Sequence, residues 1–217
     1  MKKRSALLLG ATGLIGSELL TILLQSEEYE AVTVLGRREL PIQHQKLTQL
    51  VIDFEQLSEY RSAFRVDDVY SCLGTTIKKA KSKANFEKVD YEYTITAATL
   101  ASDEKATNFL TITSLGAHSN SLFFYNRVKG KVEDKLRDIE LNCVLICQPS
   151  LLLGERDEWR RGEKFAEKVS ERLPFLFSGP LKVYRPIEGR RVAKFMYEQA
   201  LQEKTGFHIH PSTMMNT

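Results

Sequence analysis

The sequence has little of what several protein classes depend on. Its 217 residues include three cysteines, a small odd number that argues against a disulfide framework and favours a reducing compartment. No apolar run approaches the roughly 18 residues that a membrane helix needs. The 31 lysines and arginines outnumber the 28 aspartates and glutamates by only three, so the basic excess typical of nucleic-acid-binding proteins is missing. We therefore expect a cytoplasmic protein with no membrane span and no nucleic-acid partner.

Internal repeats, low-complexity tracts and recognisable linkers are also missing. Hydrophobic residues make up 42% of the chain and charged residues 27%, which is typical of a folded domain. A chain of this length can bury a core without disulfides or metals. We therefore expect one domain over residues 1–217.

The start of the chain has some features of a signal peptide. Basic residues 2–4 precede the apolar run Ala6–Leu9. The three glycines within Gly10–Gly16 interrupt that run, and Glu18 follows before any clear small-residue cleavage site. We therefore expect residues 1–35 to begin a fold.

Short apolar runs alternate with helical patterns through most of the chain. Their β-branched and apolar residues predict strands at Ala6–Leu9, Ala31–Leu35, Leu50–Ile52, Val69–Cys72, Phe109–Thr113 and Cys143–Ile146. Helical spacing predicts helices near Leu19–Leu24, over Tyr91–Ala101 and over Tyr125–Arg137. Near-continuous apolar strands separated by helices are typical of a parallel sheet covered on both faces, so we predict an α/β fold.

Residues 154–217 change character. They contain two amphipathic helical segments, around Phe165 and around Val192, and a proline-containing connection. We interpret them as an appended substrate-side lobe that is not independent. The apolar segment Leu173–Phe177 suits the core of that lobe, a wall of a substrate pocket or a dimer surface. Trp159 lies in a charged stretch and receives no contact assignment.

A glycine-rich turn stands between the first predicted strand and the first predicted helix, with the pattern G-x-x-G-x-x-G. Gly10 permits the tight turn, Gly13 lets the backbone approach a pyrophosphate, and Gly16 allows close packing of helix and sheet. The helix N-terminus adds free N–H groups and a partial positive charge. The alternative is a turn that only packs. The predicted nucleotide site comprises Gly10, Thr12, Gly13, Leu14, Ile15 and Gly16.

The end of the second predicted strand indicates which nucleotide is bound. Sites that prefer NAD usually carry an acid here, whereas this chain has Arg37 and Arg38. A guanidinium group suits a 2′-phosphate and can stack on adenine, so we predict that NADP(H) is preferred over NAD(H). Two solvated arginines are the alternative. By fold analogy, Asp53 and Phe54 follow the third strand where an adenine edge commonly lies.

Three polar residues in the second half predict acid–base chemistry. Tyr125 and Lys129 form Y-x-x-x-K, and residues four apart share a helix face. A lysine ammonium beside a phenol favours the phenolate, so Tyr125 can exchange a proton with a carbonyl or alcohol oxygen. Lys129 can also hold ribose hydroxyls. Ser114 ends the preceding strand, where parallel sheets bind ligands, and its hydroxyl can bond the substrate oxygen.

Taken together, these motifs resemble the short-chain dehydrogenase/reductase superfamily, and more narrowly its atypical branch of Tat-interacting-protein-30-like oxidoreductases. The resemblance covers roughly residues 5–205. It rests on Gly10–Gly16, Gly36–Arg38, Cys72–Thr76, Val89–Tyr91, Ser114–Ala117, Tyr125–Gly130 and Pro149–Leu153.

The resemblance implies a Rossmann-type doubly wound parallel sheet that binds NADP. It also implies Ser114, Tyr125 and Lys129 as the catalytic set, and Ser150 stands where the superfamily commonly has glycine. It implies a cofactor wall of Cys72, Leu73, Gly74 and Thr75. A nicotinamide-side loop is implied at Pro149, Ser150, Leu151 and Leu152.

Three functions follow from these residues. The first is an NADP-dependent oxidoreductase acting on a small carbonyl or alcohol substrate. The second is a non-catalytic NADPH-binding module that senses redox state or binds a protein partner, because members of the branch are proposed to act as regulators. The third is an enzyme similar to sugar-nucleotide epimerases or dehydratases. The chain is expected to be a monomer or a homodimer.

Other features favour structural roles. The four lysines within Lys78–Lys83 predict a solvated surface segment or, near the cofactor cleft, an anion-attracting rim. Cys143 and Cys147 flank an apolar strand and are expected to be buried thiols. His208 and His210 would share one face of a strand, and no third ligand stands nearby. We therefore predict no metal site.

Overall fold

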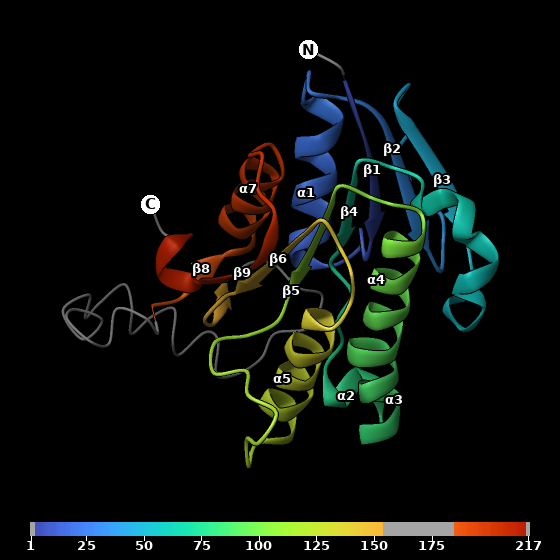
Figure 1. The fold of residues 1–217 in the computed structure, drawn as a ribbon. Coiled ribbons are helices and arrows are strands. Elements are labelled where there is room, and N and C mark those ends of the chain that lie inside the picture. The colour runs from blue at the N-terminus through green and yellow to red at the C-terminus, as the bar shows by residue number, and fades with distance from the viewer. Residues whose placement is uncertain (1–2, 154–184, 216–217) are drawn as a thin grey trace.

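The computed structural model describes residues 3–153 and 185–215. Within these ranges seven strands form one sheet in the order β3-β2-β1-β4-β5-β6-β9, and every neighbouring pair is parallel (Figure 1). The strand order reverses beside β1, so the predicted Rossmann-type doubly wound sheet is confirmed. The strands are β1 (Arg4–Leu9), β2 (Tyr29–Gly36), β3 (Leu47–Val51), β4 (Asp68–Ser71), β5 (Asn108–Ile112), β6 (Cys143–Gln148) and β9 (Gly206–Pro211); β7 (Leu152–Leu153) and β8 (Ile187–Glu188) form a separate pair.

Helices cover both faces of the sheet. The helices α1 (Leu14–Gln25) and α7 (Gly189–Ala200) pack together on one face. The other face is covered by the 3-10 segment η1 (Phe54–Phe64), α4 (Tyr93–Asp103) and α5 (Phe124–Arg137). Shorter pieces are α2 (Ile77–Ala80), α3 (Lys83–Glu87), the π-helical turn η2 (Lys88–Glu92) and the 3-10 turn η5 (Ser212–Met214). In the part of the chain described, no helix is long and apolar enough to cross a membrane.

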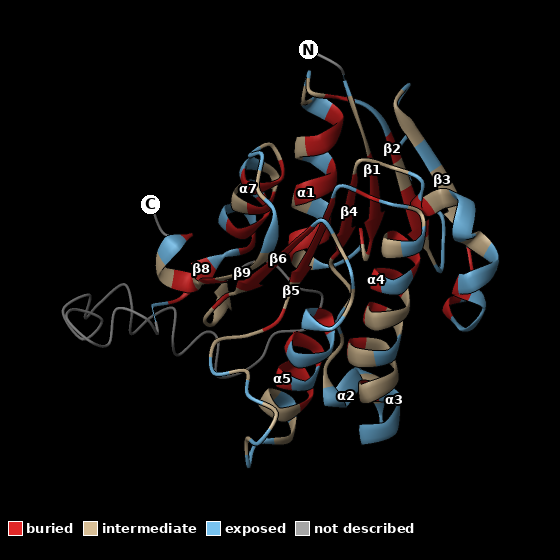
Figure 2. Cartoon of the chain, viewed as in Figure 1, coloured by how far each residue is buried: buried red, intermediate tan, exposed pale blue. Residues whose placement is uncertain are grey.

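The core has two halves because the strands are apolar on both faces. In β1, Ala6 and Leu8 belong to the buried cluster that includes α1 and α7. Leu7 and Leu9 point the other way and belong to the cluster that includes η1, α4 and α5. Figure 2 shows this buried layer running through the central strands. Such double burial explains why the strand sequences show no polar alternation.

The last described segment completes the sheet. Strand β9 pairs with β6 along its length, and α7 packs against α1. The contact begins at Gly189, where an added Cβ would lie 2.8 Å from the side chain of Leu14. Residues 185–215 therefore contribute a strand and a helix to the main fold. The helix expected around Phe165, the segment Leu173–Phe177 and Trp159 lie outside the described residues.

A buried polar network joins four strands near their N-terminal ends. Asp68 is fully buried and accepts two bonds of 2.6 Å from the Arg4 guanidinium. It also accepts bonds from the Tyr29 hydroxyl at 2.6 Å and the Asn108 amide at 2.7 Å, while Tyr29 bonds the Tyr70 hydroxyl at 2.8 Å. Burial, with the Asp68 charge nearby, raises the pKa of Tyr29 well above its ordinary value. This network lies at the sheet edge opposite the predicted ligand site.

Cysteine and histidine residues on β6 and β9 behave as the sequence predicts. Cys143 and Cys147 are buried free thiols. His208 and His210 stack on one face of β9, with ring centroids 6.3 Å apart. The described ranges contain no cluster of three or more side chains suited to a metal ion. His210 is buried against Phe195, and neither of its ring nitrogens has a hydrogen-bond partner among the described residues.

Buried His210 is expected to make the fold sensitive to mild acid. Burial, with Lys204 and His208 nearby, lowers the pKa of His210 from 6.5 to about 4. Above pH 6.5 the imidazole is neutral in both states, whereas below it only the unfolded chain takes up the proton. Stability is therefore lost as the pH falls from 6.5 to 4, by about 3 kcal/mol.

Urea unfolding at pH 7 and pH 4.5 measures this loss. The substitution His210→Leu should flatten the dependence on pH. The same substitution at the exposed His44 should leave the dependence in place. An unchanged pH dependence in His210→Leu would assign the acid sensitivity to other groups.

Candidate functional site

The glycine turn is built from backbone packed on backbone. Gly10 has φ +84°, and a Cβ there would overlap the carbonyl oxygen of Cys72 at the end of β4. A Cβ on Gly16 would overlap the carbonyl oxygen of Gly10. Gly13 donates its N–H to that same oxygen at 3.0 Å and is the N-cap of α1. Because Gly13 has no side chain, the first N–H groups of α1 stay available to an anion.

The two arginines predicted to choose the cofactor follow β2 directly. Arg37 and Arg38 are exposed and have no ion-pair partner among the described residues. Asp53 follows β3 and caps η1 by accepting the Glu55 N–H at 3.0 Å. Phe54 is buried, with its ring centroid 5.5 Å from that of Tyr93. Asp53 therefore keeps an exposed carboxylate at this edge, whereas Phe54 packs inward.

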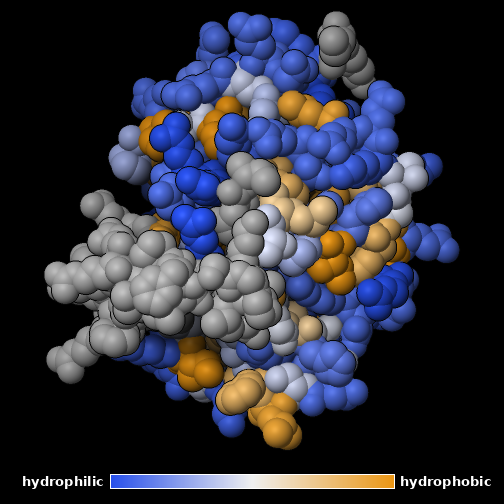
Figure 3. Space-filling model, turned by 90° about the vertical axis from the view of Figure 1, so that its left-hand side faces the viewer, coloured by the Kyte–Doolittle hydropathy of each residue, from blue (hydrophilic) through white to orange (hydrophobic). Residues whose placement is uncertain are grey.

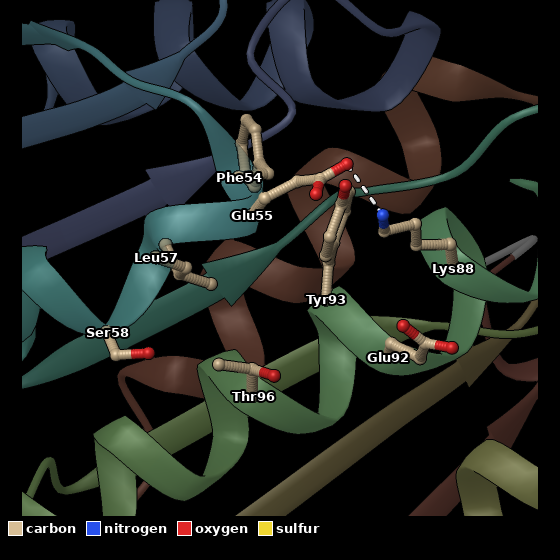
Figure 4. Close-up of a pocket in the computed structure, with 8 residues that line it drawn as sticks. All are labelled: Phe54, Glu55, Leu57, Ser58, Lys88, Glu92, Tyr93 and Thr96. Atoms are coloured by element: carbon tan, nitrogen blue, oxygen red, sulfur yellow. Dashed lines mark hydrogen bonds and ion pairs between the residues drawn. The ribbon is translucent and has the colours of Figure 1, made fainter.

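A hollow of about 180 Å³ lies beside this edge, between η1 and α4 (Figure 4). The Glu55 carboxylate and the Lys88 ammonium form an ion pair at 2.6 Å across one side of it, next to the Tyr93 ring. The hollow is separate from the predicted catalytic residues. Its lining consists of Phe54, Glu55, Leu57, Ser58, Lys88, Glu92, Tyr93 and Thr96.

Tyr125 and Lys129 lie one turn apart on α5 but in different surroundings. Tyr125 is 38% exposed, and its ring packs against Phe86 with centroids 5.7 Å apart. Lys129 is 4% exposed and donates to the Ile112 carbonyl at 3.3 Å. Ser114 follows β5, and its hydroxyl is buried with no partner among the described residues. An unpartnered buried hydroxyl suits a ligand oxygen.

The loop after Ser114 ties β5 to the start of α5. The Asn126 amide donates to the Gly116 carbonyl at 2.8 Å, and the Asn126 carbonyl accepts the His118 N–H at 3.1 Å. Gly130 is packed so closely that a Cβ there would overlap the backbone between His118 and Ser119. Gly130 ends the motif Tyr125–Gly130, and this close approach accounts for the glycine. These contacts fix the helix that carries Tyr125 against the strand end that carries Ser114.

The main site residue without a sequence-based role is Asp90. It lies in the π-helical turn η2, is 1% exposed and forms an ion pair with Lys129 at 2.8 Å. Burial opposes the charge on Lys129, but Asp90, with Tyr125 and Glu133, outweighs it and raises the pKa of Lys129. Asp90 stands in the motif Val89–Tyr91, which signals similarity but carries no chemistry by itself.

A second carboxyl group, Glu133, lies one turn beyond Lys129. It is 6% exposed, accepts a hydrogen bond from the Thr113 hydroxyl, and accepts two from the Gln148 amide at 2.9 and 3.1 Å. Burial raises its pKa, against the effect of those hydrogen bonds. Glu133 therefore connects α5, the predicted catalytic helix, to the ends of β5 and β6.

The two loops that the resemblance implies lie at the same edge. Leu115 donates its N–H to the Pro149 carbonyl at 2.9 Å, and Ser150 bonds the Ser212 hydroxyl at 3.0 Å. Leu151 precedes β7 and accepts the Ile187 N–H at 2.9 Å. On the other side, burial raises the pKa of the Cys72 thiol to about 12, which favours its protonated form.

The surface near the site carries both lysines and exposed apolar side chains, among them Leu122 and Phe123 just before Tyr125. The four lysines within Lys78–Lys83 are exposed, as the sequence predicts for a solvated segment. Lys83 places its ammonium 5.3 Å from the centroid of the Phe124 ring. Figure 3 shows hydrophilic residues over most of the described surface on one side, with apolar areas small and separate. The role of the lysines as an anion-attracting rim stays a prediction.

Comparisons with known proteins agree with this arrangement. A family model described as NAD(P)H-binding matches residues 10–174. Protein HTATIP2 of Rattus norvegicus is 38% identical over 178 residues, which cover 80% of this chain and 73% of that protein. The protein FMP52, mitochondrial, of Debaryomyces hansenii is 30% identical over 208 residues, covering 93% and 89%.

Solved structures share the fold at low sequence identity. The Bordetella bronchiseptica enzyme WbmG in complex with NAD has a TM-score of 0.70 and 16% identity, covering 97% of this chain and 73% of that one. MoeE5 in complex with UDP-glucuronic acid and NAD has a TM-score of 0.72 and 15% identity, covering 94% and 75%. At these identities the likeness concerns the fold alone.

Proposed function

Because this chain belongs to the NAD(P)H-binding family, we propose that it is an NADP(H)-dependent oxidoreductase acting on a small carbonyl or alcohol substrate. The chain has an NAD(P)-binding, oxidoreductase-like fold. The observation that carries the proposal is the Ser114 hydroxyl, which is buried and has no hydrogen-bond partner within residues 3–153 and 185–215, on the strand end to which α5 and its Tyr125 are tied. A hydroxyl buried there without a partner suits a substrate oxygen.

The site residues fit a nicotinamide dinucleotide. The glycine turn offers uncapped N–H groups to a pyrophosphate, and any side chain at Gly10 or Gly16 would overlap backbone. The guanidinium groups of Arg37 and Arg38, exposed and without an ion-pair partner in the described part of the chain, support a preference for the 2′-phosphate of NADP(H). Cys72–Thr75 and Pro149–Leu152 would line the remaining cofactor, one on each side of β5.

Each catalytic residue has a distinct role in this proposal. NADPH, when bound, supplies a hydride. The Tyr125 hydroxyl gives its proton to the substrate carbonyl oxygen, or the phenolate takes the proton from an alcohol in the reverse direction. The Ser114 hydroxyl donates a hydrogen bond to the same oxygen and orients it. Lys129 has used two of its three N–H donors on Asp90 and Ile112, which leaves one for a ribose hydroxyl.

The cofactor proposal predicts a selective thermal shift. NADPH and NADP should raise the melting temperature more than NADH and NAD, because only the phosphorylated pair can engage Arg37. The substitution Arg37→Ala should weaken NADPH binding by about tenfold, the loss of one charge-assisted contact to phosphate, while NADH binding stays nearly unchanged. A titration of melting temperature against each nucleotide measures both effects.

Arg65 offers a matched control for Arg37. It is exposed and pairs with Glu104 beyond the end of η1, far from the glycine turn. The substitution Arg65→Ala should leave the NADPH shift intact. Equal shifts with all four nucleotides would contradict the NADP preference. No shift with any of them would favour a turn that only packs, and a search for protein partners would come first.

Location and partners complete the proposal. We propose a small-molecule substrate, no nucleic-acid partner and a cytoplasmic location for a monomer or homodimer. The balanced charge supports the absence of a nucleic-acid partner. The yeast relatives are named mitochondrial, so fractionation of cells expressing the tagged chain is the direct test of location.

A further inference from the structure

The structure contains a buried ion pair between Asp90 and Lys129, and Lys129 lies one helical turn after Tyr125, the proposed acid. The Asp90 and Lys129 side chains are 1% and 5% exposed, and Oδ1 of Asp90 lies 2.8 Å from Nζ of Lys129. Burying two charges together is unfavourable unless their geometry and hydrogen bonds compensate for lost hydration. Since such a pair is costly to bury, we ask what the Asp90–Lys129 pair contributes to the proposed reaction.

Asp90 also contacts the predicted cofactor wall. Its Oδ2 accepts the Thr75 N–H at 2.9 Å, while an added Cβ on Gly74 would lie 3.6 Å from Oδ1. The two carboxylate oxygens thus bind different elements, one the loop after β4 and the other α5. The π-helical turn η2 places the side chain between them. Asp90 therefore connects the predicted cofactor wall with Lys129, which lies one turn after Tyr125 on α5.

We propose that Asp90 is a positioning residue for the reaction proposed above: it fixes the Lys129 ammonium and offsets its charge, so that the ammonium draws the proton from Tyr125 less strongly than it would alone. A lone buried ammonium beside a phenol favours the phenolate. A carboxylate at 2.8 Å from that ammonium cancels much of this effect. The protonated phenol is the form that gives a proton in carbonyl reduction.

Other charged groups around Tyr125 and Lys129 have separate partners or positions. Glu133 is held by Thr113 and Gln148, and Arg127 donates to the Ser121 carbonyl at 2.7 Å. The remaining charged or titratable groups on the elements beside them are exposed or partly exposed: Lys83, Glu87, Lys88, Tyr91, Glu92, Tyr93, Asp103, His118, Lys131, Asp134, Lys135 and Arg137. Asp90 is therefore the carboxylate in direct contact with the Lys129 ammonium in the described structure.

The substitution Asp90→Asn tests the proposal without a substrate. Ultraviolet difference spectra near 295 nm follow tyrosinate formation, and subtracting the same titration with Tyr125→Phe added isolates the Tyr125 signal. The midpoint of that signal should move to lower pH by about one unit in Asp90→Asn. An unmoved midpoint would overturn the proposal. A merely structural role would change stability and leave the midpoint in place.

Two further variants keep the test decisive. The partly exposed Glu87, which pairs with Lys131 at 3.3 Å, provides a matched control, because Glu87→Gln should leave the midpoint unmoved. If Asp90→Asn does not fold, Asp90→Ser takes its place in the same titration. Its midpoint should also lie about one unit below that of the unaltered chain, and an unmoved midpoint would again overturn the proposal.

This readout separates the two proposals. The Tyr125 titration needs neither turnover nor cofactor, so it can succeed even if no carbonyl substrate is ever reduced. If Tyr125→Phe abolishes turnover but Asp90→Asn leaves the midpoint of the Tyr125 titration unchanged, the oxidoreductase proposal stands. The proposed role of Asp90 is then wrong.

Discussion

The substitution Tyr125→Phe is expected to lower turnover of a carbonyl substrate by at least about 10²-fold while NADPH binding is retained. The change removes only the hydroxyl, because the ring that packs against Phe86 remains. Without a positioned acid, the developing alkoxide must take its proton from water. Steady-state reduction, followed by the loss of NADPH absorbance, measures turnover, and a thermal-shift titration measures binding.

A control tyrosine lies on a neighbouring helix. Tyr93 on α4 lines the hollow beside η1 and packs on Phe54, away from Ser114. The substitution Tyr93→Phe should leave turnover within about twofold of the unaltered chain, because surface hydroxyl losses away from special features have small effects. Reduction at the unaltered rate by Tyr125→Phe would show that another group supplies the proton.

The substitution Asp68→Ala is expected to reduce the free energy of unfolding by about 3–5 kcal/mol. Asp68 accepts hydrogen bonds from Arg4, Tyr29 and Asn108, and its removal leaves the Arg4 guanidinium without its carboxylate. Since a domain is stable by only about 5–15 kcal/mol, this loss is a large share of the total. Urea unfolding followed by circular dichroism measures the difference.

Smaller changes in the same network separate charge from hydrogen bonding. The substitution Tyr29→Phe removes one hydroxyl and should reduce stability by about 1–2 kcal/mol, because Asp68 keeps Arg4 and Asn108. A loss for Asp68→Ala no larger than that for Tyr29→Phe would mean that the carboxylate contributes little beyond a neutral hydrogen bond.

Most strands of the sheet follow from local sequence, whereas their doubly wound order is what the family resemblance implies. The apolar runs that predict β1, β2 and β6 are buried on both faces, so pattern and packing agree. The glycine turn is equally readable, because the steric need for glycine at Gly10 and Gly16 arises within one strand–turn–helix unit.

Features that depend on distant contacts escaped the sequence analysis. The π-helical turn η2 differs from an ordinary helix by one inserted residue, which periodicity does not detect. The role of Asp90 depends on its meeting Lys129, 39 positions away in the chain, across two packed elements. The place of β9 at the sheet edge similarly depends on pairing with β6 and not on its own pattern. The assignments of the individual cofactor-binding and catalytic residues stay predictions.

The contact between α7 and α1 has a consequence for the order of folding. The two helices lie far apart in the chain, so α7 covers the apolar face of α1 only after a long loop has closed. Until then α1 lacks this cover, and leucine side chains such as Leu19 and Leu23 are more exposed than in the folded chain. Contacts of such long sequence separation slow folding, so we expect the α1–α7 contact to form late.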